Sequence, residues 1–547
     1  MKRFPFIIFA VLGLMGCSEK MTEPATPINK GELERSYISV TLRSDDDTRA
    51  GEEFEYGEAD ERYVENVHFF LFMRDESAFP INGTSGKNYI SFDIKSNGTQ
   101  PEESGEANEG PNVSDVKDKV LIFNNYKGEY PAYIVAVLNY DAKNLRQSYS
   151  LNDLYNTIAD IRNDNSHFVM SNSVYADMQG KAIYATPLKI DNIAKSEAQA
   201  MLNPVEIYVE RISAKVEVVA NGNVVDREAT YDIETTIDDV AVYAKVLRWE
   251  LYNDYNISVV LKHISPSKWG MAGEIGFLWN DPNRYRSYWA ASYAGVFPAY
   301  NHFNWVEGFT PNNDVAYCGE NTRAVVKDSE GNITSNPRTK AIIKAQLVKE
   351  SGEPMEVAIW YGNGYNGEAA VRKEIASLLS SELFYSEGGE YKGIGADDIK
   401  AVAANEAPAG VDIEAYEVFF QLSEDALTKE WFTISNTEGY VAATNDVVNT
   451  RLAQVEPALL YKNGMTYYYT DIKHLGSPDS DSAYGVVRNH AYKVNITKIS
   501  GLGTPIFDED INFETPEQPV DVNSYVAAEV RILSWKVVKN EYDVNQN

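Results

Sequence analysis

The most constraining feature of this sequence is a long succession of short apolar runs, each about the length of a β-strand. Val67 to Phe72 and Ala132 to Leu138 are nearly unbroken apolar runs, which is typical of strands buried on both faces. The chain also carries 36 Tyr and 21 Phe, and aromatic residues favour strands. The sequence therefore predicts an all-β fold with minor α content.

A change of parity between two strand runs bears on domain organisation. Apolar residues alternate on one parity over residues 205–209 and on the other parity over residues 212–218. A β-bulge near Arg211, or two strands meeting there at a domain junction, would explain the change. With 547 residues, the chain is too long for one ordinary domain. We expect two β-sandwich domains in tandem, residues 50–210 and residues 211–547.

Two helices are expected among the strands. Leu151 to Ile161 has an apolar face, and Ser150 followed by Asp153 gives a capping box at its start. Glu368 to Leu383 carries a second apolar stripe. Because helices are few, the simplest architecture is a pair of sandwiches.

The C-terminal part is expected to be built from strands as well. Leu459 to Ile472 contains Asn463-Gly464 between two strand runs, which is the strongest short signal for a β-hairpin. Val486 to Ile496 and Tyr525 to Val538 are the last two strand-like segments.

The formal net charge of −32 excludes whole classes of partner. A nucleic acid is bound through clustered Lys and Arg, and an anionic membrane surface repels an acidic protein. We therefore expect neither partner, and membrane contact only through a covalent lipid.

The first residues resemble a bacterial lipoprotein signal. Lys2 and Arg3 precede an apolar run, Phe4 to Leu14, that is too short to span a bilayer, and Cys17 follows Met15-Gly16. We predict a signal peptide over residues 1–17 with lipid attached to Cys17. An ordinary signal peptide with a chance Cys is the alternative. The only other Cys is Cys318, so a disulfide framework and a four-Cys zinc site are excluded.

A strand and a protease-accessible loop follow the signal. In Ser36 to Arg43, the residues Ile38, Val40 and Leu42 form an apolar face. An acidic stretch then contains Arg49, and an exposed Arg in such a segment is a good protease target. From spacing alone, an ordinary loop with one Arg is the favoured interpretation.

The sequence contains no recognisable catalytic motif, and no cofactor or metal is predicted. The six His are scattered; His68 lies in a strand run and is expected to be hydrogen-bonded, and Cys318 is expected to be a structural thiol. Asp508-Glu509-Asp510 with Asn512 misses the EF-hand spacing, so a solvated loop is favoured. The 81 carboxylates leave a glycosidase-type acid pair open. The aromatic residues that could stack on sugar are Trp279, Tyr285, Tyr288 and Trp289.

Four residue patterns resemble the fimbrillins, the shaft subunits of type V pili, and specifically the branch that forms short fimbriae. They occur in order along nearly the whole chain, together with the lipoprotein signal and the C-terminal segment Glu529 to Val538. The four patterns are Val205 to Val216, Asn280 to Ala290, Tyr461 to Gly476 and Gly485 to Val494.

The fimbrillin resemblance implies transthyretin-like sandwiches and a processed N-terminus. In this family, a lipoprotein precursor fills its own groove with an N-terminal strand, which an Arg-specific protease removes. Carried over to this chain, residues 18–49 are a propeptide, Ile38, Val40 and Leu42 lie on the self-filling strand, and the bond between Arg49 and Ala50 is cleaved.

The resemblance also implies a donor strand that enters the groove of another copy, with the segment 525–538 as candidate. The alternative is that this segment is simply the last strand of its own domain. Expected partners are other copies, accessory fimbrial subunits and the Arg-specific protease; no residue identifies an adhesion receptor. The donor residues are Val526, Ala528, Val530 and Ile532 on one parity, and Leu533, Trp535 and Val537 on the other.

Two other functions stay open at this point. The chain could be an accessory tip or anchor protein of a fimbria, or a surface lipoprotein that binds glycans. We expect a structural protein and not an enzyme.

Overall fold

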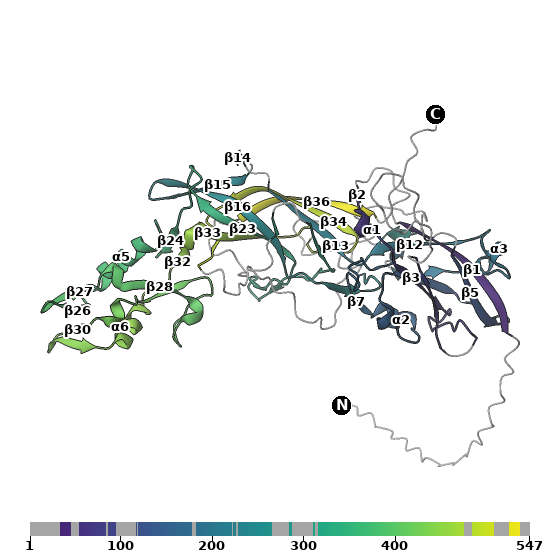
Figure 1. The fold of residues 1–547 in the computed structure, drawn as a ribbon, viewed down its shortest axis with the longest axis horizontal. Helices are drawn as coiled ribbons and strands as arrows, with labels where there is room; N and C mark the ends of the chain where they lie inside the picture. The colour runs from purple at the N-terminus through teal and green to yellow at the C-terminus, as the bar shows by residue number, and fades with distance from the viewer. Residues whose placement is uncertain are drawn as a thin grey trace, which may run out of the picture.

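The computed structural model has a fold built mainly from strands, with a few short helices, as Figure 1 shows. The all-β class with minor α content is therefore confirmed. The structure describes residues 33–44, 54–83, 86–94, 116, 119–177, 182–220, 223–225, 228–264, 284–286, 310–311, 315–474, 484–507 and 525–536.

The N-terminal part is organised around one eight-stranded sheet with the order β4-β3-β6-β8-β12-β1-β5, in which β11 pairs with β6. Its strands are β1 (Leu33–Ser44), β3 (Asn66–Phe72), β4 (Tyr89–Asp93), β5 (Lys119–Tyr126), β6 (Tyr133–Leu138), β8 (Met170–Asn172), β11 (Thr186–Pro187) and β12 (Val205–Arg211).

Both faces of this sheet are covered by apolar side chains. Phe69 and Leu71 of β3 lie in the first core, on one face of the sheet, while their neighbours Phe70 and Phe72 lie in a separate apolar cluster on the other face. Because successive side chains of a strand point to opposite faces, a strand between two cores needs an unbroken apolar run. This explains the composition of Val67 to Phe72, which the sequence predicted to be buried.

The second core lies between two sheets. The first has the order β2-β36-β34-β13-β20, and the second has the order β14-β15-β16-β23-β33-β35, with β19 paired to β16. Their strands are β2 (Phe54–Tyr56), β13 (Ala214–Ala220), β14 (Asn223–Val225), β15 (Glu228–Ile237), β16 (Val240–Tyr252), β19 (Thr310–Pro311), β20 (Val315–Cys318), β23 (Lys340–Val348), β33 (Met465–Asp471), β34 (His490–Ser500), β35 (Thr504–Pro505) and β36 (Tyr525–Lys536).

A third core lies within the segment 357–460, between β23 and β33. It combines two helices with small sheets, one of which has four strands in the order β27-β26-β30-β31. Its elements are β24 (Val357–Trp360), β25 (Asn363–Tyr365), α5 (Glu368–Leu379), β26 (Leu383–Glu387), β27 (Glu390–Gly393), β28 (Ile399–Ala403), β29 (Val418–Leu422), β30 (Trp431–Ser435), β31 (Gly439–Ala443), α6 (Asn445–Leu452) and β32 (Leu459–Tyr461).

The remaining elements are short. They are the helices α1 (Ala59–Arg62), α2 (Leu151–Tyr155) and α3 (Glu197–Ala200), and the strands β7 (Ile158–Asp160), β9 (Tyr175–Asp177), β10 (Ala182–Ile183), β17 (Ile257–Val259), β18 (Arg284–Arg286), β21 (Val326–Lys327) and β22 (Ile333–Ser335), with 3-10 turns at Ala142–Asn144, Ile190–Asn192, Ala396–Asp398, Ala404–Glu406, Ala426–Thr428 and Lys462–Gly464.

Both predicted helices exist, but both are shorter than expected. The Ser150–Asp153 capping box forms as predicted, yet α2 ends at Tyr155 and residues 158–160 form β7, which pairs with β17. Similarly, α5 ends at Leu379, and Leu383 begins β26. In both places the residues that would have continued the apolar stripe of the helix form a strand instead, because they pair with another strand.

The prediction of a β-hairpin at Asn463-Gly464 is wrong, although the turn and both flanking strands exist. Asn463 and Gly464 adopt the positive φ values of 54° and 76° that this turn needs. However, β32 pairs with β24, whereas β33 pairs with β23 and β35. The two strands therefore belong to different sheets and do not pair with each other.

The parity change near Arg211 marks two strands and not a bulge. β12 belongs to the eight-stranded sheet, while β13 pairs with β34 and β20.

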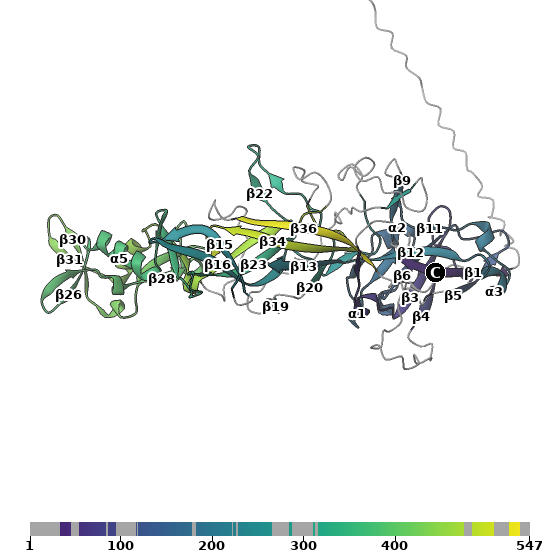
Figure 2. The same cartoon turned by 90° about the horizontal axis from the view of Figure 1, so that it is seen from above.

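The three cores follow one another along an elongated molecule. The eight-stranded sheet lies at one end and the 357–460 segment at the other, and two perpendicular views agree on this (Figures 1 and 2).

Candidate functional site

β1, the first of the described strands, occupies an interior position in its sheet. β1 runs parallel to β12, with Val40 opposite Val205, and antiparallel to β5, with Ile38 opposite Leu121. Two further backbone contacts hold it: the N–H of Tyr37 donates to Ala194 O at 2.9 Å, and the N–H of Leu42 donates to Val116 O at 3.1 Å. Removing β1 would therefore separate β12 from β5 and leave unpaired backbone groups on both.

Both faces of β1 are buried. Ile38, Val40 and Leu42 lie in the first core with at most 2 % of their surface exposed. On the opposite parity, Ser39 and Thr41 are buried as well. The segment that the sequence singled out is thus a fully integrated strand.

The predicted cleavage site lies between two strands that belong to different sheets. β1 ends at Ser44 and β2 begins at Phe54, and β2 pairs in parallel with β36, with Phe54 opposite Ser534. Arg49 and Ala50 lie outside the described residues. The connection that contains them links β1 of the eight-stranded sheet to β2, the neighbour of β36.

The predicted donor segment forms β36, which is also an interior strand. It lies antiparallel to β34, with Val530 opposite Val494, and has β2 on its other side. Figures 1 and 2 show it in yellow beside β34. Val526 packs against the second core, and Val537 lies outside the described residues. In this structure β36 is therefore paired on both sides with strands of its own chain.

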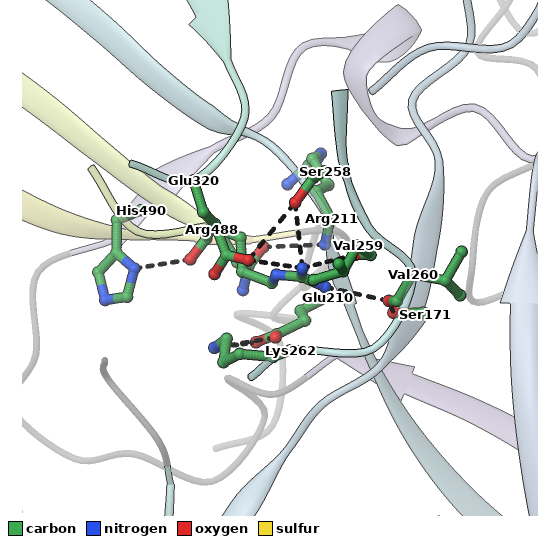
Figure 3. A network of polar contacts seen from close by, with 11 residues as sticks. Ser171, Glu210, Arg211, Ser258, Val259, Val260, Lys262, Glu320, Arg488 and His490 are labelled. Atoms are coloured by element: carbon green, nitrogen blue, oxygen red, sulfur yellow. Dashed lines mark hydrogen bonds and ion pairs between the residues drawn. The ribbon is translucent and has the colours of Figure 1, made fainter. Parts of the chain in front are cut away.

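Buried charged groups connect the eight-stranded sheet to the second core, where β12 ends and β13 begins (Figure 3). Nζ of Lys262 lies 2.9 Å from Oε1 of Glu210, and neither side chain is exposed. Nε of Arg211, the next residue, donates to Glu61 O at 2.8 Å. A buried charge is tolerated only when it is paired. We call this cluster the joint; its residues are Glu61, Glu210, Arg211, Lys215, Lys262, Glu320 and Arg488.

Arg488 is the second centre of the joint. Its Nη2 donates to Glu320 Oε2 and to Val259 O, both at 2.6 Å, and its Nη1 donates to Val260 O at 3.0 Å. Val259 ends β17, which pairs with β7. Arg488, which lies just before β34, thereby ties the second core to a segment docked on the N-terminal part of the chain.

Two of the four sequence patterns that resemble fimbrillins meet in the joint. The backbone N–H of Arg211, from the first pattern, donates to Asn489 Oδ1 of the fourth at 3.4 Å. In return, the N–H of Asn489 donates to the carbonyl of Ser213 at 2.7 Å. These residues are separated by more than 270 positions. Both patterns place charged residues beside apolar runs, and this was the available signal for a buried polar contact.

Glu61 of α1 contacts two other residues of the joint, Arg211 and Lys215. Burial raises the pKa of its carboxyl, but hydrogen bonds from Tyr317 and Lys215 outweigh burial, so the pKa lies below its usual value. Nζ of Lys215 is 2.9 Å from Oε1 of Glu61. For Tyr317, burial and the hydrogen bond to Glu61 raise the pKa of the phenol. Sequence reasoning did not identify Glu61, because nothing near it in the chain indicates a partner.

Two residues that the sequence analysis singled out, His68 and Cys318, are buried and have surroundings typical of structural residues. His68 is buried, and its ring nitrogens lie 2.8 Å from Ser91 Oγ and 2.9 Å from Tyr140 O. Cys318 is fully buried, and burial raises the pKa of its thiol well above its usual value. An unreactive, structural thiol fits this environment.

Other candidates lie outside the described residues, or have side chains that are not described. Within the described ranges, no group of three or more His, Cys, Asp or Glu is placed to hold a metal ion, and no helix in them is long and apolar enough to cross a membrane. The candidates that lie outside are Cys17, Asp508, Glu509, Asp510, Asn512, Trp279, Tyr288 and Trp289; Tyr285 lies in β18, but its side chain is not described.

These features define a class of protein: a multi-core β protein in which β1 and β36, the first and last of the described strands, both fill interior positions of their sheets. In the C-terminal part, residues 459–541 match the family model "Major fimbrial subunit protein type IV, Fimbrillin, C-terminal". This match confirms the resemblance to the fimbrillins. Among curated proteins, none matches the chain.

Solved structures of fimbrial proteins align over most of the chain at low similarity. A fimbrilin (fimA) from Porphyromonas gingivalis W83 is 12% identical, with a TM-score of 0.36, covering 92% of this chain and 98% of that one. The tip fimbrial protein Mfa3 from Porphyromonas gingivalis is 11% identical, with a TM-score of 0.30, covering 92% and 100% respectively.

Proposed function

We propose that this chain is the shaft subunit of a cell-surface fimbria and that it assembles by strand exchange. The precursor is lipidated on Cys17 and anchored at the outer membrane. An Arg-specific protease cleaves after Arg49, β1 leaves, and β36 of another copy takes its place. The observation that carries the proposal is that β1 lies entirely before Arg49 and fills an interior position between β12 and β5.

The energetics of β1 support such an exchange. Its three core side chains, Ile38, Val40 and Leu42, are almost completely buried, and each contributes about 1.5–3 kcal/mol. Loss of β1 therefore costs on the order of 5–9 kcal/mol, before the unpaired backbone groups are counted. An open groove with free strand edges is a template for another extended chain.

β36 matches β1 as a replacement in length and pattern. Both strands have 12 residues. Val526, Ala528, Val530 and Ile532 alternate along β36, as Ile38, Val40 and Leu42 do along β1. Donation requires β36 to leave β34 and β2. Each subunit would then receive one strand and give one, and such a head-to-tail contact does not close, so it generates a filament.

The decisive experiment treats the purified precursor with an Arg-specific protease. We expect ladders of polymer that resist detergent without heating. Arg49→Ala should abolish the ladders, whereas the matched variant Arg43→Ala should retain them. A chain truncated before Tyr525 should be cleaved but should not polymerise.

Each outcome separates one part of the proposal from the rest. Polymer from Arg49→Ala would overturn the cleavage site. Polymer from the truncated chain would overturn the donor strand. A chain that is cleaved after Arg49 but stays monomeric would contradict the shaft role altogether.

A further inference from the structure

The small four-stranded sheet of the 357–460 segment has one strongly apolar outer face. Residues opposite each other in neighbouring strands lie on the same face. Phe384 pairs with Phe432 and with Gly393, while Ile434 pairs with Tyr440. Following the registers through all four strands gives one set of residues that contains no charge: Phe384, Ser386, Tyr391, Gly393, Phe432, Ile434, Tyr440 and Ala442. We call this set the aromatic face.

The opposite face of the same sheet is already used. Leu383 and Trp431 lie on it, and both are buried in the third core. The sheet therefore packs its inner face against the third core and presents the aromatic face outward. Tyr391, Ile434 and Tyr440 have 44%, 54% and 42% of their surface exposed.

The exposed rings form one organised cluster. Tyr391 and Tyr440, from the two outermost strands, stack on each other with ring centroids 3.9 Å apart and an interplanar angle of 14°. Phe384 packs edge-on to Tyr440 at 4.9 Å, and Phe432 packs edge-on to Tyr391 at 4.9 Å. The sheet lies at the end of the molecule opposite to β1 (Figures 1 and 2), so it is separate from the proposed strand exchange.

Acidic residues lie at both ends of this sheet. The exposed Glu387 and Glu390 flank the turn between β26 and β27; they pair with each other on the opposite parity from the aromatic face, and Glu387 is ion-paired with Lys392. The turn between β30 and β31 carries the exposed Glu438. Because β26 and β30 are antiparallel, these two turns lie at opposite ends of the sheet. The whole segment 357–460 contains 17 Asp and Glu against 6 Lys and Arg.

We propose that the aromatic face binds a basic protein segment that presents Lys or Arg together with apolar side chains. An apolar aromatic centre within a charged rim is the usual anatomy of a protein-binding surface. Arg and Lys are attracted to the faces of Tyr and Phe rings, and the acidic excess of the 357–460 segment supplies the complementary charge. Two copies meeting at this face would each bring the same acidic excess of the 357–460 segment, and like charges repel.

The experiment uses the full chain and three synthetic 12-residue peptides as probes. All three contain the same four Leu; the remaining positions are Ser, with four of them replaced by Arg in the first peptide and by Glu in the second, and with none replaced in the third. Isothermal titration calorimetry at low and at physiological salt gives the affinities. We expect the Arg peptide to bind at least tenfold more tightly than the uncharged peptide.

Substitutions that keep the charge constant isolate the aromatic face from general electrostatics. The double variant Tyr391→Ala/Tyr440→Ala should lose at least tenfold in affinity for the Arg peptide. Tyr391→Leu/Tyr440→Leu keeps apolar surface and folds with less perturbation, but removes the rings, and should lose a similar factor. Tyr361→Ala is the matched control, since Tyr361 is 61% exposed but lies outside the four-stranded sheet.

Three results would overturn the proposal. Equal binding of the Arg peptide by wild type and by both double variants would mean that net charge alone attracts it. Equal binding of the Arg and uncharged peptides would exclude a basic partner. Self-association of the wild-type chain that both double variants abolish, measured by sedimentation, would identify a second copy as the occupant.

Discussion

Nη2 of Arg488 lies 2.6 Å from Oε2 of Glu320, and both side chains are buried where the second core meets the N-terminal part of the chain. The two residues are 168 positions apart in the sequence. The same guanidinium binds the carbonyl oxygens of Val259 and Val260. A planar group with five donors suits such a convergence of acceptors. The orientation of the two parts of the molecule therefore depends on this pair.

Breaking this pair should destabilise the protein strongly. Glu320→Ala leaves Arg488 as a buried charge without its carboxylate, and this typically costs about 3–5 kcal/mol in the free energy of unfolding. Urea denaturation checks the value. Glu387→Ala is the control, because it removes an exposed ion pair with Lys392, and exposed pairs contribute little to stability. A loss below 1 kcal/mol for Glu320→Ala would contradict the role of the pair.

Truncating a side chain of β1 should weaken the precursor but not the assembled fibre. Ile38 is fully buried, so Ile38→Ala should cost about 2–5 kcal/mol of precursor stability in urea. Ile122, on the neighbouring strand, is 48% exposed, and Ile122→Ala should cost less than about 1 kcal/mol. Since residue 38 is removed with β1 under the proposed function, fibres of Ile38→Ala should dissociate at the wild-type temperature. A lower dissociation temperature would show that β1 is retained.

The turn at Gly464 should not tolerate a side chain. Gly464 has φ of +76°, and a Cβ there would lie 2.5 Å from the carbonyl oxygen of Leu347. Strain and clash together should cost Gly464→Ala about 2–4 kcal/mol, measured by thermal or urea unfolding. Gly388 also has positive φ but has open space around it, so Gly388→Ala should cost only about 1 kcal/mol. Equal losses would mean that the contact with Leu347 relaxes freely.

Stability should depend on pH through Asp254, because burial raises the pKa of its carboxyl from 3.8 to about 6. The folded state retains a proton that the unfolded state has lost between these values, so this stability falls as pH rises through the window. Asp254→Asn removes the effect. It should change little at pH 3.5 and stabilise the protein by at most about 3 kcal/mol at pH 7.

Unfolding measured at both pH values tests this prediction. The exposed residue Asp191 provides a control, and Asp191→Asn should leave the difference between the two pH values unchanged. A gain from Asp254→Asn that is the same at pH 3.5 and pH 7 would exclude titration of Asp254 as its cause.

Local signals in the sequence predicted local structure well. The alternation that identified β12 and β13, and the Ser150–Asp153 box that starts α2, depend only on neighbouring residues. The same reasoning failed at Leu459 to Ile472, where both strands exist but pair with other sheets. Partner choice is decided by residues far away in the chain, which a pattern of two neighbouring runs does not contain.

The sequence alone determined the β class, the strand pattern of Ile38, Val40 and Leu42, and the resemblance to fimbrillins, because periodicity and motif order are written along the chain. Only the tertiary structure decided that β1 lies between β12 and β5, that Glu61 is buried against Lys215, and that the aromatic face is left open. The physical reason is that burial and ion pairing depend on contacts between distant segments. Glu61 and Glu387 carry the same carboxylate group. Only their surroundings make Glu61 a buried ion-pair partner and Glu387 an exposed surface residue.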